Sequence, residues 1–204
     1  MKSIHRTLQR LALAALTATA FLSQAEATPV VSISPATQNI GVGAPGSINI
    51  IVSGLTAPTG GFSLTLAFNN SFLSGVSFFN DPGVKMGASP LDLSGGFTGG
   101  SLDLYFAADA TSTLAGLTAS EGASFTLATV NFLGAASGLS PLTLSKVVLS
   151  NFDGTAGLAG VTSTNGQICV GAGDCAINPV PEPETYLLFA AGLAVLAMRR
   201  RRAK

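Results

Sequence analysis

Residues 62–68, Phe-Ser-Leu-Thr-Leu-Ala-Phe, set the fold class of this chain. Large apolar side chains alternate there with small or polar ones, in the order Phe62, Ser63, Leu64, Thr65, Leu66, Ala67, Phe68. Successive side chains of a strand point to opposite faces, so this period of two predicts a strand with one buried face.

The same alternation recurs along the chain. Further runs lie at residues 48–52, 102–106, 142–149 and 168–170. Within 124–132 the phase changes, which predicts a β-bulge near Ala128 and Thr129. Clusters of Gly, Pro and Asn separate the runs, at residues 41–46, 58–61, 80–83, 95–100 and 151–157. This regular punctuation predicts an all-β protein with an antiparallel sandwich or barrel.

Two further segments lie between the alternating runs. Residues 108–119 are the nearest candidate for a helix, but they are rich in threonine and contain a glycine, so we predict a loop. The near-duplicates 91–93 and 102–104, both Leu-Asp-Leu, flank a glycine-rich stretch. They predict an internal hairpin with a wide loop.

The order of these stretches resembles a cohesin-like domain of the carbohydrate-binding sandwich superfamily. The matching stretches are residues 30–34, 46–53, 61–69, 72–73, 125–132, 141–149 and 165–170. The resemblance implies an antiparallel jelly-roll β-sandwich of about eight to nine strands over residues 28–178, with no catalytic site and a dockerin-like protein as partner. The chain departs from the family in an insertion at about 81–100 and in its few charges, and no binding residue is carried over.

Charge is segregated along the chain, although ten basic and ten acidic residues cancel. Eight of the ten basic residues lie in the first 27 and the last six positions. The span 28–180 has two lysines against seven acids, a net charge of −5. An acidic body without clustered Lys and Arg does not bind phosphate backbones, so we expect no nucleic-acid partner.

The N-terminal segment has the features of a secretory signal peptide. Three basic residues precede the apolar run 11–22, and Ala25-Glu26-Ala27 follows it as an A-x-A site. Signal peptidase would cleave after Ala27, so residues 1–27 are predicted to be removed on export.

The C-terminal segment is predicted to enter the inner membrane. Residues 185–198 form an apolar run of 14 residues, short of the ~20 that usually cross a bilayer core. Four arginines, Arg199, Arg200, Arg201 and Arg202, follow it directly and would hold that end in the cytoplasm as a stop-transfer signal. We expect a short transmembrane helix that anchors the chain at least transiently.

A proline-flanked glutamate, Pro181-Glu182-Pro183, stands just before that run. The order of motif, short span and arginines over residues 179–204 resembles the PEP-CTERM protein-sorting signal of Gram-negative bacteria. The resemblance implies processing by exosortase and a cell-surface or extracellular location, often in species that make exopolysaccharide. It also implies that Pro181, Glu182 and Pro183 are recognition residues of a substrate. The bland alternative is an ordinary C-terminal anchor.

The composition excludes several kinds of catalysis. The single histidine, His5, lies in the predicted signal peptide, so the mature chain has no histidine for Ser/His/Asp, Cys/His or His-ligated zinc chemistry. Glycoside hydrolysis by two carboxylates remains open. There is no Trp, and Tyr105 is the only Tyr outside the C-terminal span, so sites that stack sugars on exposed Trp or Tyr are poorly supplied. We expect no enzyme and no catalytic residue.

No cofactor and no metal site is expected, with calcium as an open alternative. Its candidate ligands, with loop carbonyls, are Asp92, Asp103, Asp109 and Asp153. The alternative is that these acids are simply solvated.

Cys169 and Cys175 are the only cysteines and lie in a short segment. In an oxidising compartment such a pair predicts a disulfide. A loop this small removes little chain entropy, so the bridge would act locally, at the end of the last strand.

Three functional hypotheses follow. The leading one is a non-enzymatic exported protein, delivered to the cell surface or extracellular matrix of a biofilm by exosortase, with a structural or adhesive sandwich. The alternative is a module that binds a dockerin-like protein or an exopolysaccharide. The third is a carboxylate-dependent glycoside hydrolase, which requires two acids ~5 to 9.5 Å apart in a cleft.

Overall fold

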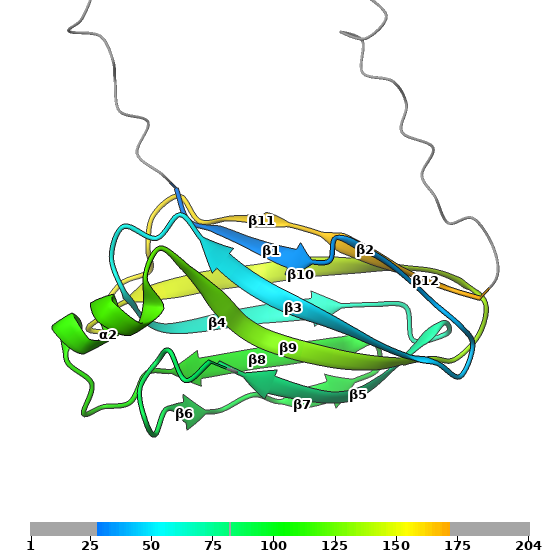
Figure 1. Cartoon of the computed structure of the whole chain (residues 1–204), viewed down its shortest axis with the longest axis horizontal. Coiled ribbons are helices and arrows are strands. Elements are labelled where there is room, and N and C mark those ends of the chain that lie inside the picture. Colours follow the sequence, from blue (N-terminus) through cyan, green and yellow to red (C-terminus); the bar gives the residue numbers. More distant parts are fainter. Residues whose placement is uncertain (1–27, 82, 172–204) are drawn as a thin grey trace, which may run out of the picture.

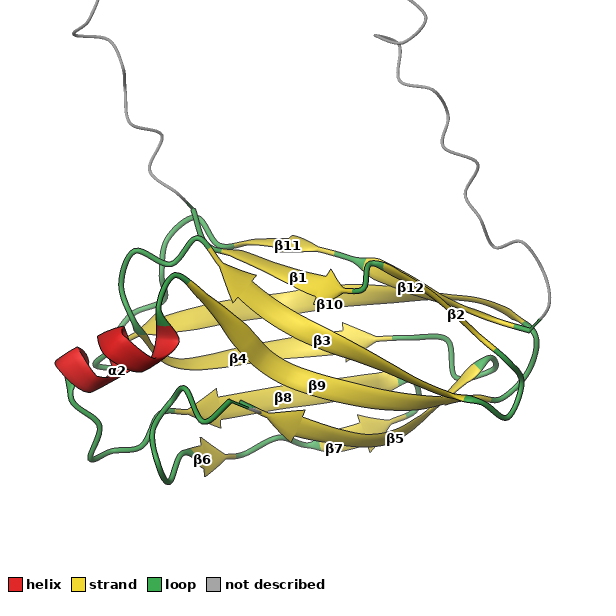
Figure 2. Ribbon diagram, in the orientation of Figure 1, coloured by secondary structure: helices red, strands yellow, loops and turns green. Residues whose placement is uncertain are grey.

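A computed structural model of the chain describes residues 28–81 and 83–171. These residues form two packed β-sheets with one short helix at one end (Figures 1 and 2). The predicted signal peptide at 1–27 and the predicted sorting signal at 179–204 lie outside the described residues.

The first sheet has the strand order β11-β1-β3-β9-β5. Its strands are β1 (Val30–Ser34), β3 (Pro45–Ser53), β5 (Leu73–Asn80), β9 (Ser124–Gly134) and β11 (Thr162–Thr164). We call it sheet 1.

The second sheet, sheet 2, has the order β2-β12-β10-β4-β8-β6, and β7 also pairs with β8. Its strands are β2 (Thr37–Ile40), β4 (Thr59–Ala67), β6 (Leu91–Asp92), β7 (Gly96–Thr98), β8 (Ser101–Ala107), β10 (Gly138–Asn151) and β12 (Gly166–Val170). Most pairings are antiparallel, but β1 with β11 and β2 with β12 are parallel. The predicted all-β jelly-roll sandwich is therefore confirmed. Nine strands have four or more residues, and β6, β7 and β11 are shorter.

The core lies between the two sheets, where the inward side chains of both meet. In β4 the alternation predicted from the sequence is exact in Phe62, Leu64 and Leu66, which are at most 3% exposed. The inward residues of β3 are Ile48, Ile50 and Val52, each at most 1% exposed. Burial of these apolar surfaces, at ~25 cal/mol per Å², holds the sheets together.

The predicted bulge is present in β9. Ile50 and Ile51 of β3 pair with Ala128 and Thr126, so Leu127 is the extra residue. Leu127 and Ala128 are both fully buried, which is the change of phase that the sequence shows.

The repeat at 91–93 and 102–104 forms the predicted hairpin, in two short pieces. Leu91 pairs with Ala107 through β6, and Phe97 pairs with Leu102 through β7. Between the pieces, the backbone N–H groups of Leu93 and Gly95 donate to carbonyls of β8.

The prediction of a loop at 108–119 was wrong in its second half. Residues Leu114–Glu121 form α2, whose N-cap Thr113 accepts a hydrogen bond from the Gly116 N–H. The helix lacks an apolar stripe, so its residues carry no periodic signal. It is held by tertiary contacts, because Leu117 and Glu121 are each only 2% exposed.

Candidate functional site

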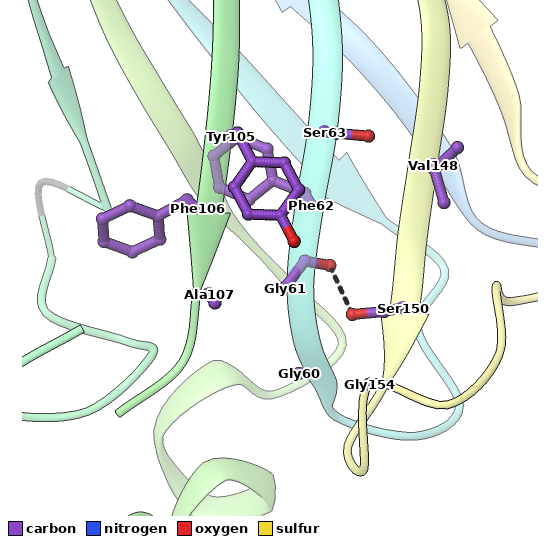
Figure 3. Close-up of a pocket in the computed structure, with 10 residues that line it drawn as sticks. All are labelled: Gly60, Gly61, Phe62, Ser63, Tyr105, Phe106, Ala107, Val148, Ser150 and Gly154. Atoms are coloured by element: carbon purple, nitrogen blue, oxygen red, sulfur yellow. Dashed lines mark hydrogen bonds between the residues drawn. The ribbon is translucent and has the colours of Figure 1, made fainter. Parts of the chain in front are cut away.

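A groove of about 180 Å³ lies on the outer face of sheet 2. It runs over β4 between β8 and β10, and the 151–157 turn borders one end (Figure 3). Ten residues line it: Gly60, Gly61, Phe62, Ser63, Tyr105, Phe106, Ala107, Val148, Ser150 and Gly154.

The groove exists because the central strand carries small outward residues. Ser63 of β4 pairs with Tyr105 on one side and with Val148 on the other. Side chains of directly paired residues stand on the same face of a sheet, so the two larger side chains form walls over a small floor. Each wall is 49% exposed.

The next step of the floor is Gly61, which lies between Ala107 and Ser150. A Cβ atom at Gly61 would lie 2.7 Å from the carbonyl oxygen of Phe106, so a side chain there would displace backbone. The Ser150 hydroxyl donates to the Gly61 carbonyl over 3.2 Å and fixes β10 against this glycine (Figure 3).

Exposed apolar residues continue from the groove toward the edge of the sheet. Leu91 is 54% exposed and pairs with Ala107, which places it on the same face as Tyr105. Leu93 is 57% exposed, and its N–H donates to the Tyr105 carbonyl. We call Leu91, Leu93, Tyr105 and Val148 the apolar row. An exposed apolar set beside a groove is typical of a protein-binding surface.

One acid on this face is already engaged. Asp103, one pair further along β8, accepts a 2.6 Å hydrogen bond from the Thr65 hydroxyl. No charged side chain lines the groove itself.

Two other acids are buried close to each other at the α2 end of the sandwich. Glu121 is 2% exposed and Asp81 is 5% exposed. Asp81 accepts backbone N–H groups of Lys85 and Met86, each at 2.7 Å. The pKa of Glu121 is raised to about 7, mainly by burial and to a smaller extent by the charge of Asp81, while hydrogen bonds from Thr59 act to lower it.

The charge of Asp81 acts on Glu121, but the pair is not accessible as a catalytic dyad would be. Neither carboxylate lines the groove or the second pocket of about 350 Å³ between α2 and residues 84–88. Two carboxylates act on a sugar only from a cleft that the sugar enters. The pair therefore gives the hydrolase hypothesis no support.

The four candidate calcium ligands are spread over separate elements. Asp92 accepts from the Asn80 side chain and the Ser94 N–H, and Asp103 from Thr65. Hydrogen bonds from Thr111 lower the pKa of Asp109, and Asp153 is exposed in the turn after β10. Within residues 28–81 and 83–171, no three His, Cys, Asp or Glu side chains are placed to hold a metal ion. Calcium binding stays an open alternative, without support from a preformed site in the described residues.

Of the remaining predicted site residues, only Cys169 lies within the described part of the chain. Cys169 is buried in β12, paired with Leu139 of β10. Its predicted partner Cys175 lies outside the described residues, and so do the motif Pro181-Glu182-Pro183, the arginines 199–202 and the cleavage-site alanines Ala25 and Ala27. Within the described part of the chain, no helix combines the length and apolarity needed to cross a bilayer.

Known proteins are similar to this chain in two places, the C-terminal segment and the body. The family profile of the PEP-CTERM protein-sorting motif matches residues 179–202. The match confirms the resemblance seen in Pro181-Glu182-Pro183 and the features that follow it. No curated protein matches the chain.

Solved structures similar to the body include several cohesins. A non-cellulosomal cohesin from the archaeon Archaeoglobus fulgidus aligns with a TM-score of 0.53 at 14% identity, covering 71% of this chain and 91% of its own. A cohesin module of a family 33 glycoside hydrolase from Clostridium perfringens gives 0.56 at 13% identity, covering 71% and 98%. The body has a cohesin-like fold.

A third cohesin-like relative was solved with a partner. It is the sixth cohesin of scaffoldin B from Acetivibrio cellulolyticus, in complex with a Cel5 dockerin. Its TM-score is 0.55 at 16% identity, and the alignment covers 70% of this chain and 99% of that one. Identities this low establish the shared fold of the cohesin-like body and leave its function to its own residues.

Sequence reasoning did not find the groove. The signal available was the position of Tyr105, a large side chain on the solvent phase of the alternating run 101–107. Val148 was hidden because β10 has a register shift between Ser145 and Val148, which changes its phase.

Proposed function

We propose that this protein is an exosortase substrate exported to the cell surface, and that its cohesin-like body is a non-catalytic module that binds a protein partner. The match at residues 179–202 supports the sorting step. Signal peptidase would release residues 1–27, and exosortase would act near Pro181-Glu182-Pro183. The inner membrane would hold the chain at least until that step.

The observation that carries the binding role is the apolar row beside the groove on sheet 2. Tyr105 and Val148 stand on either side of a floor made of Gly61 and Ser63. An anchor side chain of a partner would fill this groove, while Leu91 and Leu93 would exclude water at its rim. The partner class that fits is a dockerin-like module with an apolar contact surface.

A structural or adhesive role in the extracellular matrix is the second candidate. It is favoured by the sorting signal and by the cohesin-like body, which need no ligand for such a role. It does not explain why four large apolar side chains are exposed on one face.

The test compares a charge placed in the groove with the same charge placed elsewhere. Val148→Asp inserts a carboxylate into the groove wall, and Asn70→Asp adds one in the exposed turn after β4. Full-length protein and both variants, in detergent, are immobilised, and proteins of a surface extract from the source cells are captured and identified by mass spectrometry.

A dockerin-like protein bound by the wild type and Asn70→Asp, and lost with Val148→Asp, supports the proposal. Equal capture by all three proteins, or no partner at all, contradicts the binding role and leaves the structural one.

A further inference from the structure

The charged residues of the described part of the chain all lie outside the strands of sheet 1. Two lysines and six acids lie within 28–81 and 83–171: Lys85, Lys146, Asp81, Asp92, Asp103, Asp109, Glu121 and Asp153. None of them belongs to the five strands of sheet 1. Exposed sheet faces ordinarily carry charged side chains, which keep a protein soluble. The outer face of sheet 1 differs, because none of its strands carries a charge.

The outward residues of sheet 1 are mainly hydroxyls and amides, in rows set by the strand pairing. One row runs from Ser34 across Asn49 and Thr129 to Phe79. The next runs from Ser47 across Asn131 to Ser77. The row on the other side is Ser32, Ile51 and Thr126. We call these three rows the neutral face (Figure 1 shows the strands that carry it).

Hydrogen bonds between neighbouring strands fix the two amides of the neutral face. The Thr129 hydroxyl donates to Asn49 Oδ1 over 2.8 Å, and Asn131 Nδ2 donates to the Ser77 hydroxyl over 3.0 Å. Among the described residues, Asn49 Nδ2 has no acceptor and Asn131 Oδ1 has no donor, so each amide keeps a group for a ligand. An amide held in one orientation loses less entropy when it binds.

At the edge of this array stands an aromatic ring. Phe79 is 59% exposed at the end of the row that contains Asn49 and Thr129. The Phe79 ring offers an apolar surface next to polar groups. A ligand ring with apolar faces and polar edges requires this combination.

These features point to an uncharged, polyhydroxylated ligand. A hydroxyl group both donates and accepts, and so do the Ser, Thr and Asn side chains of the neutral face. A polyanion would meet no cation there and would be repelled by the net acidic body. A protein partner favours aromatic, Met and Arg anchors in pockets. This face instead has mainly small polar side chains, with Ile51 in one row and one ring at the edge.

We propose that the outer face of sheet 1 is a binding site for a neutral polysaccharide chain, with Asn49 and Asn131 as hydrogen-bonding residues and Phe79 as the stacking residue. The neutral face is the outer side of sheet 1, and the apolar row is on sheet 2. One molecule could thus hold a protein partner and a glycan together.

The test uses the full-length chain in detergent, with affinity electrophoresis in gels that contain one polysaccharide. Dextran and hydroxyethyl cellulose are the neutral probes, and alginate is the polyanionic one. The wild-type chain should be retarded by at least one neutral probe and not by alginate.

The variant pair is matched in charge. Asn49→Asp with Asn131→Asp adds two carboxylates to the neutral face, and Asn70→Asp with Thr143→Asp adds two at exposed positions outside it. We expect the first double variant to weaken neutral-glycan binding by tenfold or more, and the second to change it less than twofold. Phe79→Ala, a change at an exposed position, should weaken binding as well and replaces the first variant if that one unfolds.

Three results would overturn the proposal. The first is no retardation by either neutral probe, and the second is equal retardation of both double variants. The third is self-association of the wild type in analytical ultracentrifugation that Asn49→Asp with Asn131→Asp abolishes, without glycan binding, because the face would then be an interface between two copies. None of them bears on the groove of sheet 2, which the Val148→Asp test addresses separately.

Discussion

Glu121 of α2 accepts two hydrogen bonds from one residue, Thr59, at the start of β4. The Thr59 N–H lies 2.7 Å from Oε2 and the Thr59 hydroxyl lies 3.3 Å from the same oxygen. The second carboxyl oxygen, Oε1, is buried and has no partner among the described residues. The contact ties the only helix of the described residues to the central strand of the groove, at the price of a buried acid.

The burial of Glu121 makes stability depend on pH, because burial raises the pKa of its carboxyl group. The folded-state pKa of Glu121 is about 7, above the usual 4.5, so the folded chain binds more protons between these values than the unfolded chain does. Its contribution is fully present below pH 4.5 and is lost as pH rises to 7. At ~1.4 kcal/mol per pKa unit, the loss is at most about 3 kcal/mol. Urea unfolding at pH 4.5, 6 and 8 measures it.

Glu121→Gln is the matched variant, because it keeps an acceptor for Thr59 and cannot ionise. We expect the stability difference between pH 4.5 and 8 to shrink by about 2 kcal/mol. An unchanged pH profile in Glu121→Gln would show that other groups cause the dependence.

Phe97, from β7, closes the open side of the sandwich between β5 and β8. Its ring packs edge-on against Phe68, Phe78 and Phe132, with centroid distances of 6.0 to 6.3 Å. It lies against Gly75, where a Cβ atom would enter the ring. Phe97→Ala should cost about 3 kcal/mol of unfolding free energy. Leu91→Ala, at an exposed position of the same insertion, should change it by less than ~0.5 kcal/mol. Equal effects in chemical denaturation would contradict this role.

The pairing of Cys169 with Cys175 remains a prediction that thiol titration decides. We expect no reactive thiol in the mature protein under denaturing, non-reducing conditions, and two after reduction. Because the closed loop is small, reduction should lower the unfolding free energy only modestly. Two thiols before reduction would contradict the bridge.

The processing steps predict defined masses. In the native host, the mature chain should begin at Thr28 and end near Pro181. Changing Pro181-Glu182-Pro183 to alanines should leave the C-terminal segment attached, while the N-terminal cleavage after Ala27 proceeds. Intact-mass spectrometry of the exported protein measures both ends, and the same mature mass for wild type and variant would argue against exosortase recognition.

Much of the fold was predictable because the alternation of apolar and polar residues within a strand shows which of its side chains are buried. The alternation in residues 62–66 and 48–52 placed the inward faces of β4 and β3 correctly, and the phase change near Ala128 located the bulge of β9. The helix α2 was missed because its residues have no apolar period. What holds it is the burial of Leu117 and the contact between Glu121 and Thr59, residues 62 positions apart.

The sequence by itself determined the class of the molecule: an exported, acidic, all-β body with a sorting signal at its C-terminal end. Only the tertiary structure decided which strands are neighbours, and therefore which outward residues share a surface. Tyr105 and Val148 face each other across Ser63, and Asn49 lies between Ser34 and Thr129, through pairings that join distant parts of the chain. The physical reason is that alternation tells a side chain only whether it points in or out. Its companions on the surface are chosen by long-range hydrogen bonding and packing of the whole sheet.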